Sequence, residues 1–141
     1  MENIKELFKH LRFQCENEVI EFKKAERNFD ITELGKYFSA LSNEANLRGL
    51  DFAWLVFGVE DKSRIVTGTS FKEGQIHLER LKETIAQNLT ERISFRDIYE
   101  DYEDGKRILI FKIPAAPRGL PIAWNGQCYG RRGESLVSLD P

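Results

Sequence analysis

The sequence contains few of the residues that build disulfide frameworks or metal sites. Among its 141 residues there are only two cysteines and two histidines. Cys15 and Cys128 lie far apart and outside any Cys-x-x-Cys pattern, and His10 and His77 have no neighbours at ligand spacing. These spacings indicate neither a disulfide framework nor a zinc site. We therefore expect two reduced thiols, as in a cytosolic protein.

Long apolar segments and a strong basic charge are also missing. No apolar run reaches the roughly 18 residues that a membrane span requires. The N-terminus, with Glu2, Lys5 and Glu6, lacks the apolar segment of a secretory signal. The net charge of −2 gives no overall attraction to phosphate, so any site for a polyanion must be a local patch. We expect a soluble, cytoplasmic protein with no membrane partner.

Phosphate-cradling and nucleophile motifs are absent as well. The sequence contains no GxxxxGK[ST], GxGxxG or GxSxG pattern, so we expect no nucleotide hydrolysis and no cofactor. What is present is an ordinary globular composition, with 41% hydrophobic residues, 31% charged residues and four prolines. The length and composition predict a single domain over residues 1–141.

Three segments show the apolar spacing that is typical of amphipathic helices. The first covers residues 4–11. The second begins near Asp30 or Thr32, both good N-cap residues, and runs to about Asn46. The third covers residues 75–89 and has an apolar and a charged side. We predict a helix at each segment.

The opening strand, about residues 18–24, carries an unusual number of charges. Because successive side chains of a strand point to opposite faces, Ile20 and Phe22 are expected to face a core. Glu21 and Lys23 then point away from it, onto a solvated face. The role of these outward charges is the main question that the sequence poses.

Two further strand signals fix the centre of the sheet. Residues 52–59 are almost continuously apolar, which predicts a central strand covered on both faces, and a small strand at residues 64–67 follows. Asp104-Gly105 between two extended runs predicts a type I′ hairpin turn. The turn sets a register with two opposite-charge pairs and one apolar pair: Glu103 with Lys106, Asp97 with Lys112, and Ile98 with Phe111.

The proline-containing residues 114–121 then form a loop, and residues 126–137 a last extended segment. The order of elements predicts a mixed α/β (α+β) domain with a single main β-sheet and about three helices packed on it.

Four segments occur in the order of a known family. They are ENEVIEFKKA (16–25), ALSNEA (40–45), WLVFGVEDKSRIVTGT (54–69) and IPAAPRGLPIAWNGQCYGRRGES (113–135). Together they resemble the Schlafen AlbA-like domain, a DNA-binding domain at the N-terminus of many bacterial proteins described as transcriptional regulators or ATP-binding proteins. The resemblance implies the AlbA-like fold, DNA as the partner, and an ATPase-like C-terminal domain in a longer protein of which this chain is the N-terminal part.

Cations at both ends of the chain are candidates for binding the nucleic-acid backbone. Arginine suits this role because its planar fork matches phosphate bidentately, and such contacts position a strand without reading its bases. The alternative is that these cations balance neighbouring carboxylates such as Glu26 and Glu134. The candidates are Lys23, Lys24 and Arg27 after the first strand, and Arg118, Arg131 and Arg132 near the C-terminus.

A second hypothesis is catalytic. In eukaryotic Schlafen proteins, a related fold cleaves structured RNA with two glutamates and a later aspartate. The resemblance carries these roles onto Glu16, Glu21 and Asp61, which as hard oxygen ligands would hold Mg²⁺ or Mn²⁺ in a metal-dependent ribonuclease. The alternative is that Glu21 is a surface charge and Asp61 belongs to an ordinary turn. We favour binding over catalysis.

A third hypothesis is an interaction module, in which the domain forms a homodimer or docks a further domain. A homodimer would also supply the second lobe that the Schlafen nucleases use to clamp RNA.

Overall fold

The fold contains three α-helices, a short 3-10 helix and seven strands over the residues that the computed structural model describes, which are 3–13, 18–133 and 135–139. The elements are α1 (Ile4–Phe13), β1 (Ile20–Lys23), α2 (Ile31–Leu47), β2 (Phe52–Phe57), α3 (Gln75–Ala86), η1 (Thr90–Arg92), β3 (Asp97–Glu103), β4 (Lys106–Pro114), β5 (Ala123–Trp124), β6 (Gln127–Arg132) and β7 (Ser135–Leu139).

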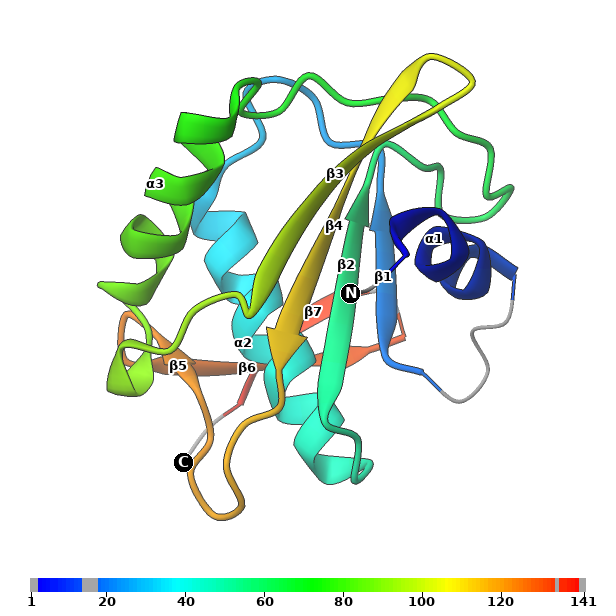
Figure 1. Ribbon diagram of the computed structural model, residues 1–141. Coiled ribbons are helices and arrows are strands. Elements are labelled where there is room, and N and C mark those ends of the chain that lie inside the picture. Colours follow the sequence, from blue (N-terminus) through cyan, green and yellow to red (C-terminus); the bar gives the residue numbers. More distant parts are fainter. Residues whose placement is uncertain (1–2, 14–17, 134, 140–141) are drawn as a thin grey trace.

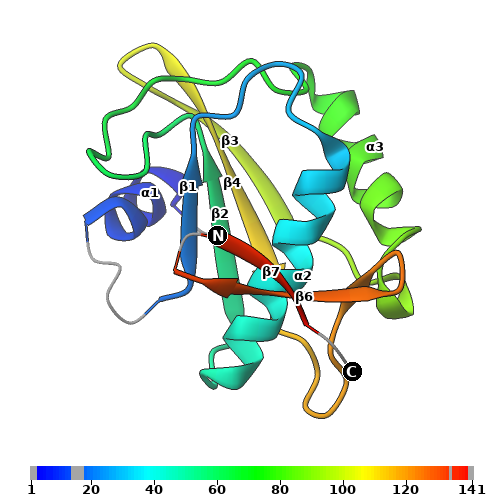
Figure 2. The ribbon, with the colours of Figure 1, turned by 180° about the vertical axis from the view of Figure 1, so that it is seen from behind.

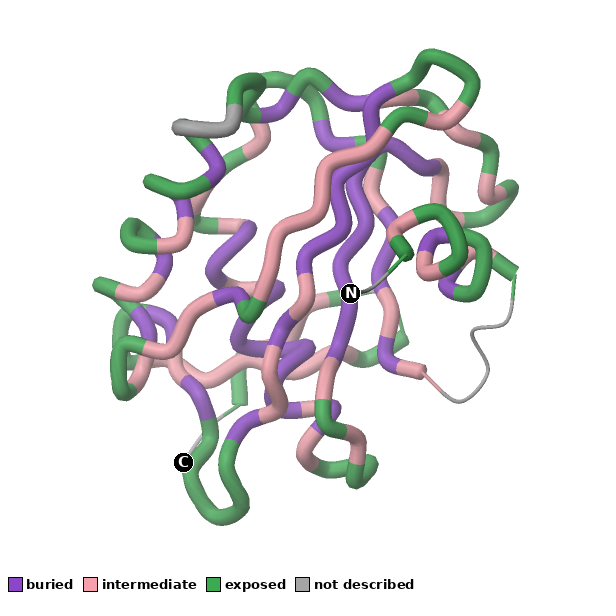
Figure 3. Tube along the Cα trace, viewed as in Figure 1, coloured by how far each residue is buried: buried purple, intermediate pink, exposed green. Residues whose placement is uncertain are grey.

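The main sheet has four strands in the order β1-β2-β4-β3 (Figure 1). β1 and β2 are parallel, whereas β4 is antiparallel to both β2 and β3. The apolar segment forms the central strand β2 as predicted, and β2 and β4 are buried along most of their length (Figure 3). β2 ends at Phe57 because Gly58 turns the chain with a φ of 96°. A Cβ there would approach the carbonyl oxygen of Arg107 to 2.8 Å, so glycine is required.

The β3–β4 hairpin confirms the predicted register. Asp104 and Gly105 have φ values of 51° and 76°, as a type I′ turn demands. Glu103 pairs with Lys106, Asp97 with Lys112 and Ile98 with Phe111.

Helices cover both faces of the main sheet. α1 lies on one face, where Phe8 and Leu11 pack against Phe22 and Val56, and α2 and α3 lie on the other (Figures 1 and 2). The predicted cap of α2 is confirmed at Asp30, whose side chain accepts a hydrogen bond from the Thr32 backbone N–H at 2.8 Å.

The C-terminal part of the chain forms a second sheet, β5-β6-β7, in addition to the main sheet. The mixed α+β fold is therefore confirmed, but the last extended segment is two antiparallel strands, preceded by β5. Strand β6 crosses α2 (Figure 2), where the buried Asn43 donates to the carbonyl oxygens of Ile122 at 3.0 Å and Tyr129 at 3.2 Å. The ALSNEA segment thus ties α2 to the second sheet.

Two details differ from the sequence prediction. Residues 64–67 form no strand but a single bridge between Val59 and Val66, because Arg64 adopts a positive φ of 61° that interrupts extension. α3 ends at Ala86, and Leu89 instead forms a bridge with Trp124. No helix in the described ranges is long and apolar enough to cross a bilayer.

Candidate nucleic-acid interface

The loops that follow β1 and β2 meet at one edge of the main sheet. Because the two strands are parallel, residues 24–30 and residues 58–74 leave the sheet on the same side. The Gly58 N–H donates to the Lys23 carbonyl oxygen at 2.8 Å, and the Thr69 hydroxyl donates to the Ala25 carbonyl oxygen at 2.6 Å. The carboxyl ends of parallel strands are a common position for ligand sites in α/β sheets.

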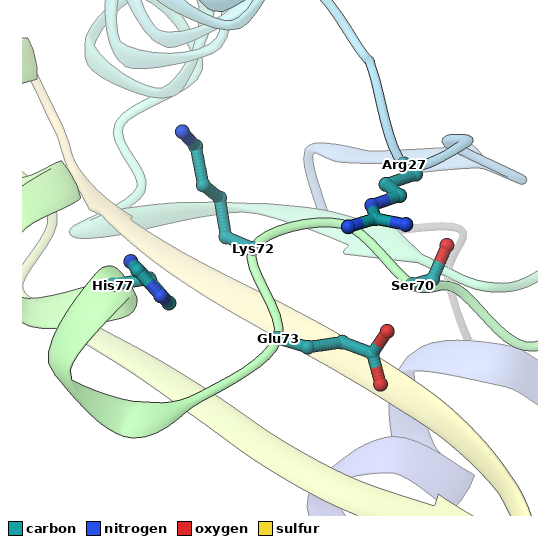
Figure 4. Close-up of a pocket in the computed structure, with 5 residues that line it drawn as sticks. All are labelled: Arg27, Ser70, Lys72, Glu73 and His77. Atoms are coloured by element: carbon teal, nitrogen blue, oxygen red, sulfur yellow. The ribbon is translucent and has the colours of Figure 1, made fainter.

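Three adjoining pockets run between these loops, and we call them together the strand-end groove. The first, of about 320 Å³, is lined by residues 21–24 and 60–62. The second, of about 390 Å³, shares Lys24 with the first and is lined by residues 24–27 and 67–70. The third, of about 250 Å³, shares Arg27 and Ser70 with the second and also contacts Lys72, Glu73 and His77 (Figure 4).

The charge of the strand-end groove changes along its length. The first pocket is balanced, because Lys23, Lys24 and Lys62 face Glu21, Glu60 and Asp61. In the second and third pockets, the cations Lys24, Arg27 and Lys72 outnumber the carboxylates Glu26 and Glu73. The groove is therefore most attractive to anions at the end near α3.

Four exposed cations of the groove have side chains that make no hydrogen bond or ion pair with the described residues. They are Lys24, Arg27, Lys62 and Lys72. Their charges are therefore available to an external anion. The sequence indicated Lys24 and Arg27 as candidates but not Lys62 and Lys72, although both of these follow the predicted central strand.

Arg107, also missed, holds the loop that carries part of this groove. Its side chain is 5% exposed and donates to the carbonyl oxygens of Thr69 at 3.1 Å, Phe71 at 2.7 Å and Lys72 at 3.1 Å. Its Nε donates to Glu100 on β3. An exposed loop is thus fixed by a buried cation from the sheet, which reduces the ordering that ligand binding would require.

Glu21 is not on a solvated face, and this prediction is wrong. Its side chain is 3% exposed, because Arg131 of the second sheet covers it. Arg131 donates to Glu21 Oε1 at 2.8 Å and to the Ile20 carbonyl oxygen at 3.1 Å. It also binds both carboxylate oxygens of Glu44, at 2.8 and 3.0 Å. The ion pairs join β1, α2 and β6.

The pKa values of the groove side chains follow from this burial. Burial raises the pKa of Glu21 and the charge of Asp61 adds to this effect, while Arg131 opposes it without cancelling it. Burial disfavours charged Lys23, but contact with Tyr37 and the nearby carboxylates outweighs it, so the pKa of Lys23 is raised. Both shifts have the causes expected of a partly desolvated charge cluster.

The other predicted cations lie in different environments. The Lys23 ammonium lies 5.0 Å from the centre of the Tyr37 ring. Arg131 is committed to Glu21 and Glu44, whereas its neighbour Arg132 is exposed. The loop after β4 lies at the opposite end of the sheet, because β4 runs antiparallel to β2 (Figure 1). Arg118 is exposed on this loop. The structure brings Lys23, Lys24 and Arg27 together but not Arg118.

Two of the three predicted metal ligands line the first pocket. Glu21 and Asp61 are both there, and Glu16 lies outside the described residues. One Glu21 oxygen is already bound by Arg131. Among the described residues, no three His, Cys, Asp or Glu side chains lie close enough to hold a metal ion together. The described side chains therefore do not by themselves form a metal site.

A family match covers most of the chain, including the four segments singled out in the sequence. The chain matches the family described as "Schlafen, AlbA_2" over residues 16–140. The chain belongs to this family. No curated protein matches the sequence.

Two solved structures of low sequence identity share the fold of this chain. The crystal structure of the DIP2311 protein from Corynebacterium diphtheriae is 17% identical with a TM-score of 0.65, and the match covers 97% of this chain but only 26% of that one. The solution structure of the N-terminal domain of a protein from Nitrosomonas europaea, named as related to the ATP-dependent DNA helicase RecG, is 20% identical with a TM-score of 0.52. That match covers 96% of this chain and 92% of that domain.

Proposed function

We propose that this AlbA_2 domain binds nucleic acid, with DNA as the preferred form, through the cations of the strand-end groove. The observation that carries the proposal is the set of four exposed cations on two loops that meet at one sheet edge: Lys24, Arg27, Lys62 and Lys72, whose side chains make no hydrogen bond or ion pair with the described residues. Because the chain has a net charge of −2, attraction to a polyanion must come from such a local cluster.

The positions of the other arginines narrow the predicted binding surface. Arg131 forms ion pairs with two carboxylates, those of Glu21 and Glu44, which largely neutralise its charge. Arg118 lies at the opposite end of the sheet from Lys24 and Arg27. We therefore assign phosphate contacts to the groove cations and a structural role to Arg131, and we leave Arg118 out of the interface.

Salt dependence of binding tests the proposal. Fluorescence anisotropy with duplex and single-stranded oligonucleotides should show affinity that falls steeply with salt. Removing one phosphate contact lowers the log–log slope by about one, so Lys24→Gln and Arg27→Gln should each do so. Arg118→Gln is the matched control, an exposed arginine that should leave the slope unchanged. Absence of binding at low salt would refute the proposal, and an equal effect of Arg118→Gln would place the interface elsewhere.

A metal-dependent nuclease is the second candidate, favoured by one observation. Glu21 and Asp61 line the same pocket, next to cations that would hold a phosphate. Incubation of tRNA and DNA with Mn²⁺ or Mg²⁺ tests it, since cleavage must occur with the native chain and disappear in Asp61→Asn. Glu21→Gln must also abolish cleavage while the protein stays folded. Without cleavage, the binding function stands alone.

The wider setting is also a proposal. We infer that the domain belongs to a bacterial transcriptional regulator, in which an ATPase-like domain follows and the AlbA_2 domain supplies DNA contacts. The Nitrosomonas neighbour supports a DNA-related context, since it is an N-terminal domain of a protein named after a DNA helicase. Light scattering with and without DNA tests for a homodimer. A stable dimer without any DNA binding would favour an interaction module instead.

A further inference from the structure

The third pocket of the strand-end groove has a composition that differs from the rest. Its side chains come from three parts of the chain: Arg27 from the loop after β1, Ser70, Lys72 and Glu73 from the loop after β2, and His77 from α3 (Figure 4). It therefore combines a planar guanidinium, an ammonium, a hydroxyl, an imidazole and one carboxylate around about 250 Å³.

The pocket also lies at one end of the groove. It shares Arg27 and Ser70 with the second pocket, which in turn shares Lys24 with the first. A nucleic-acid strand that follows the groove past Lys24 would place its terminal nucleotide at the third pocket. Within the described residues the Arg27 and Lys72 side chains have no internal partner, and Arg107 fixes the backbone on both sides of Phe71.

From this arrangement we infer that the third pocket binds the terminal phosphate monoester of a nucleic-acid strand. A monoester carries close to two negative charges at neutral pH and presents three acceptor oxygens. A phosphodiester inside a strand carries one charge and has two free oxygens. Arg27 binds phosphate oxygens bidentately, the Lys72 ammonium swings on its flexible stem to a further oxygen, and Ser70 donates a hydrogen bond.

Glu73 sets the strength of this preference. Its carboxylate lines the pocket and repels a dianion, so it holds affinity for the phosphate below what the two cations would give. The inference deepens the proposed function and rests on it, since a strand must first bind in the groove. The two are separable, because the groove can bind strands without distinguishing their ends.

Anisotropy with short labelled strands that carry a 5′-phosphate, a 3′-phosphate or only hydroxyl ends tests the inference. We expect at least one phosphorylated end to bind about tenfold tighter than the hydroxyl strand, the gain of one good charge-assisted hydrogen bond. Lys72→Gln should reduce this ratio to about one, and Glu73→Gln should increase it. Lys24→Gln is the matched control, which should weaken all strands alike and leave the ratio unchanged.

The possible failures are distinguishable. Equal binding of hydroxyl and phosphorylated strands would overturn the inference and leave the proposed function intact. No binding of any strand at low salt would overturn both. A nucleoside monophosphate that binds as tightly as the phosphorylated strand would show that the pocket takes a free nucleotide, and would overturn the assignment to a strand end.

Discussion

Replacement of Arg131 by methionine should destabilise the domain without weakening DNA contacts. The substitution keeps much of the side-chain length but leaves Glu21, which is 3% exposed, without its cation. Removing one partner of a buried ion pair costs about 3–5 kcal/mol. Glu44 is 24% exposed and still has Arg48 as an ion-pair partner in the variant, so losing its contact with Arg131 adds less to the stability loss. We expect a loss near the lower limit, about 3 kcal/mol.

The stability loss caused by Arg131→Met should be smaller at low pH than at neutral pH. The folded-state pKa of Glu21 is raised, so its charged form opposes folding, and the opposition disappears as pH falls and Glu21 binds a proton. The pKa of Glu44 is lowered: burial alone would raise it, but Arg131 and Arg48 outweigh burial. The native chain loses that stabilisation in acid. Both effects make the difference in unfolding free energy between native chain and variant smaller at low pH.

Urea unfolding followed by tryptophan fluorescence at neutral and mildly acidic pH measures this difference. Arg132→Met is the matched control, because this exposed neighbour makes no ion pair within the described part of the chain and should cost less than about 0.5 kcal/mol. Adding Glu21→Gln to Arg131→Met should recover part of the lost stability. The reasoning is refuted if Arg131→Met is no more destabilising than the control, or if its deficit grows in acid.

Three other predictions concern packing and loop order. Gly35→Ala should cost about 1–3 kcal/mol and shift tryptophan emission, because a Cβ at Gly35 would lie 2.2 Å from the Trp124 ring, which must move. Asn43→Ala should cost about 1–3 kcal/mol in urea unfolding, since it leaves buried backbone groups near the second sheet unsatisfied, and a value near zero would contradict the role given to it. Arg107→Met should speed hydrogen exchange in residues 67–73 and leave Glu100 unpaired; unchanged exchange there would show that other contacts order the loop.

Local patterns were sufficient for most of the secondary structure. Asp104-Gly105 determined the hairpin register, because two consecutive positive φ values permit few other turns. The continuous apolar run marked β2 as central, and Asp30 marked the start of α2. The short-range terms that govern turns, caps and periodicity act within a few residues, and a sequence shows them directly.

The burial of Glu21 could not be predicted from local sequence patterns. Strand alternation correctly separated it from Phe22, but could not show whether its own face is covered. The covering residue, Arg131, is 110 positions away in the chain. The same applies to Arg107, whose burial depends on a loop more than 30 positions earlier.

The sequence by itself determined where the helices, the central strand and the hairpin lie, and it indicated Lys24 and Arg27 as candidate phosphate contacts. Only the tertiary structure decided which cations are neutralised and which are available. Whether a charge is neutralised depends on the opposite charges that the fold brings within a few ångströms. Separation along the sequence does not show which charges these are. Arg131 and Arg27 look equivalent in sequence, yet the first joins three elements from inside and the second faces an open groove.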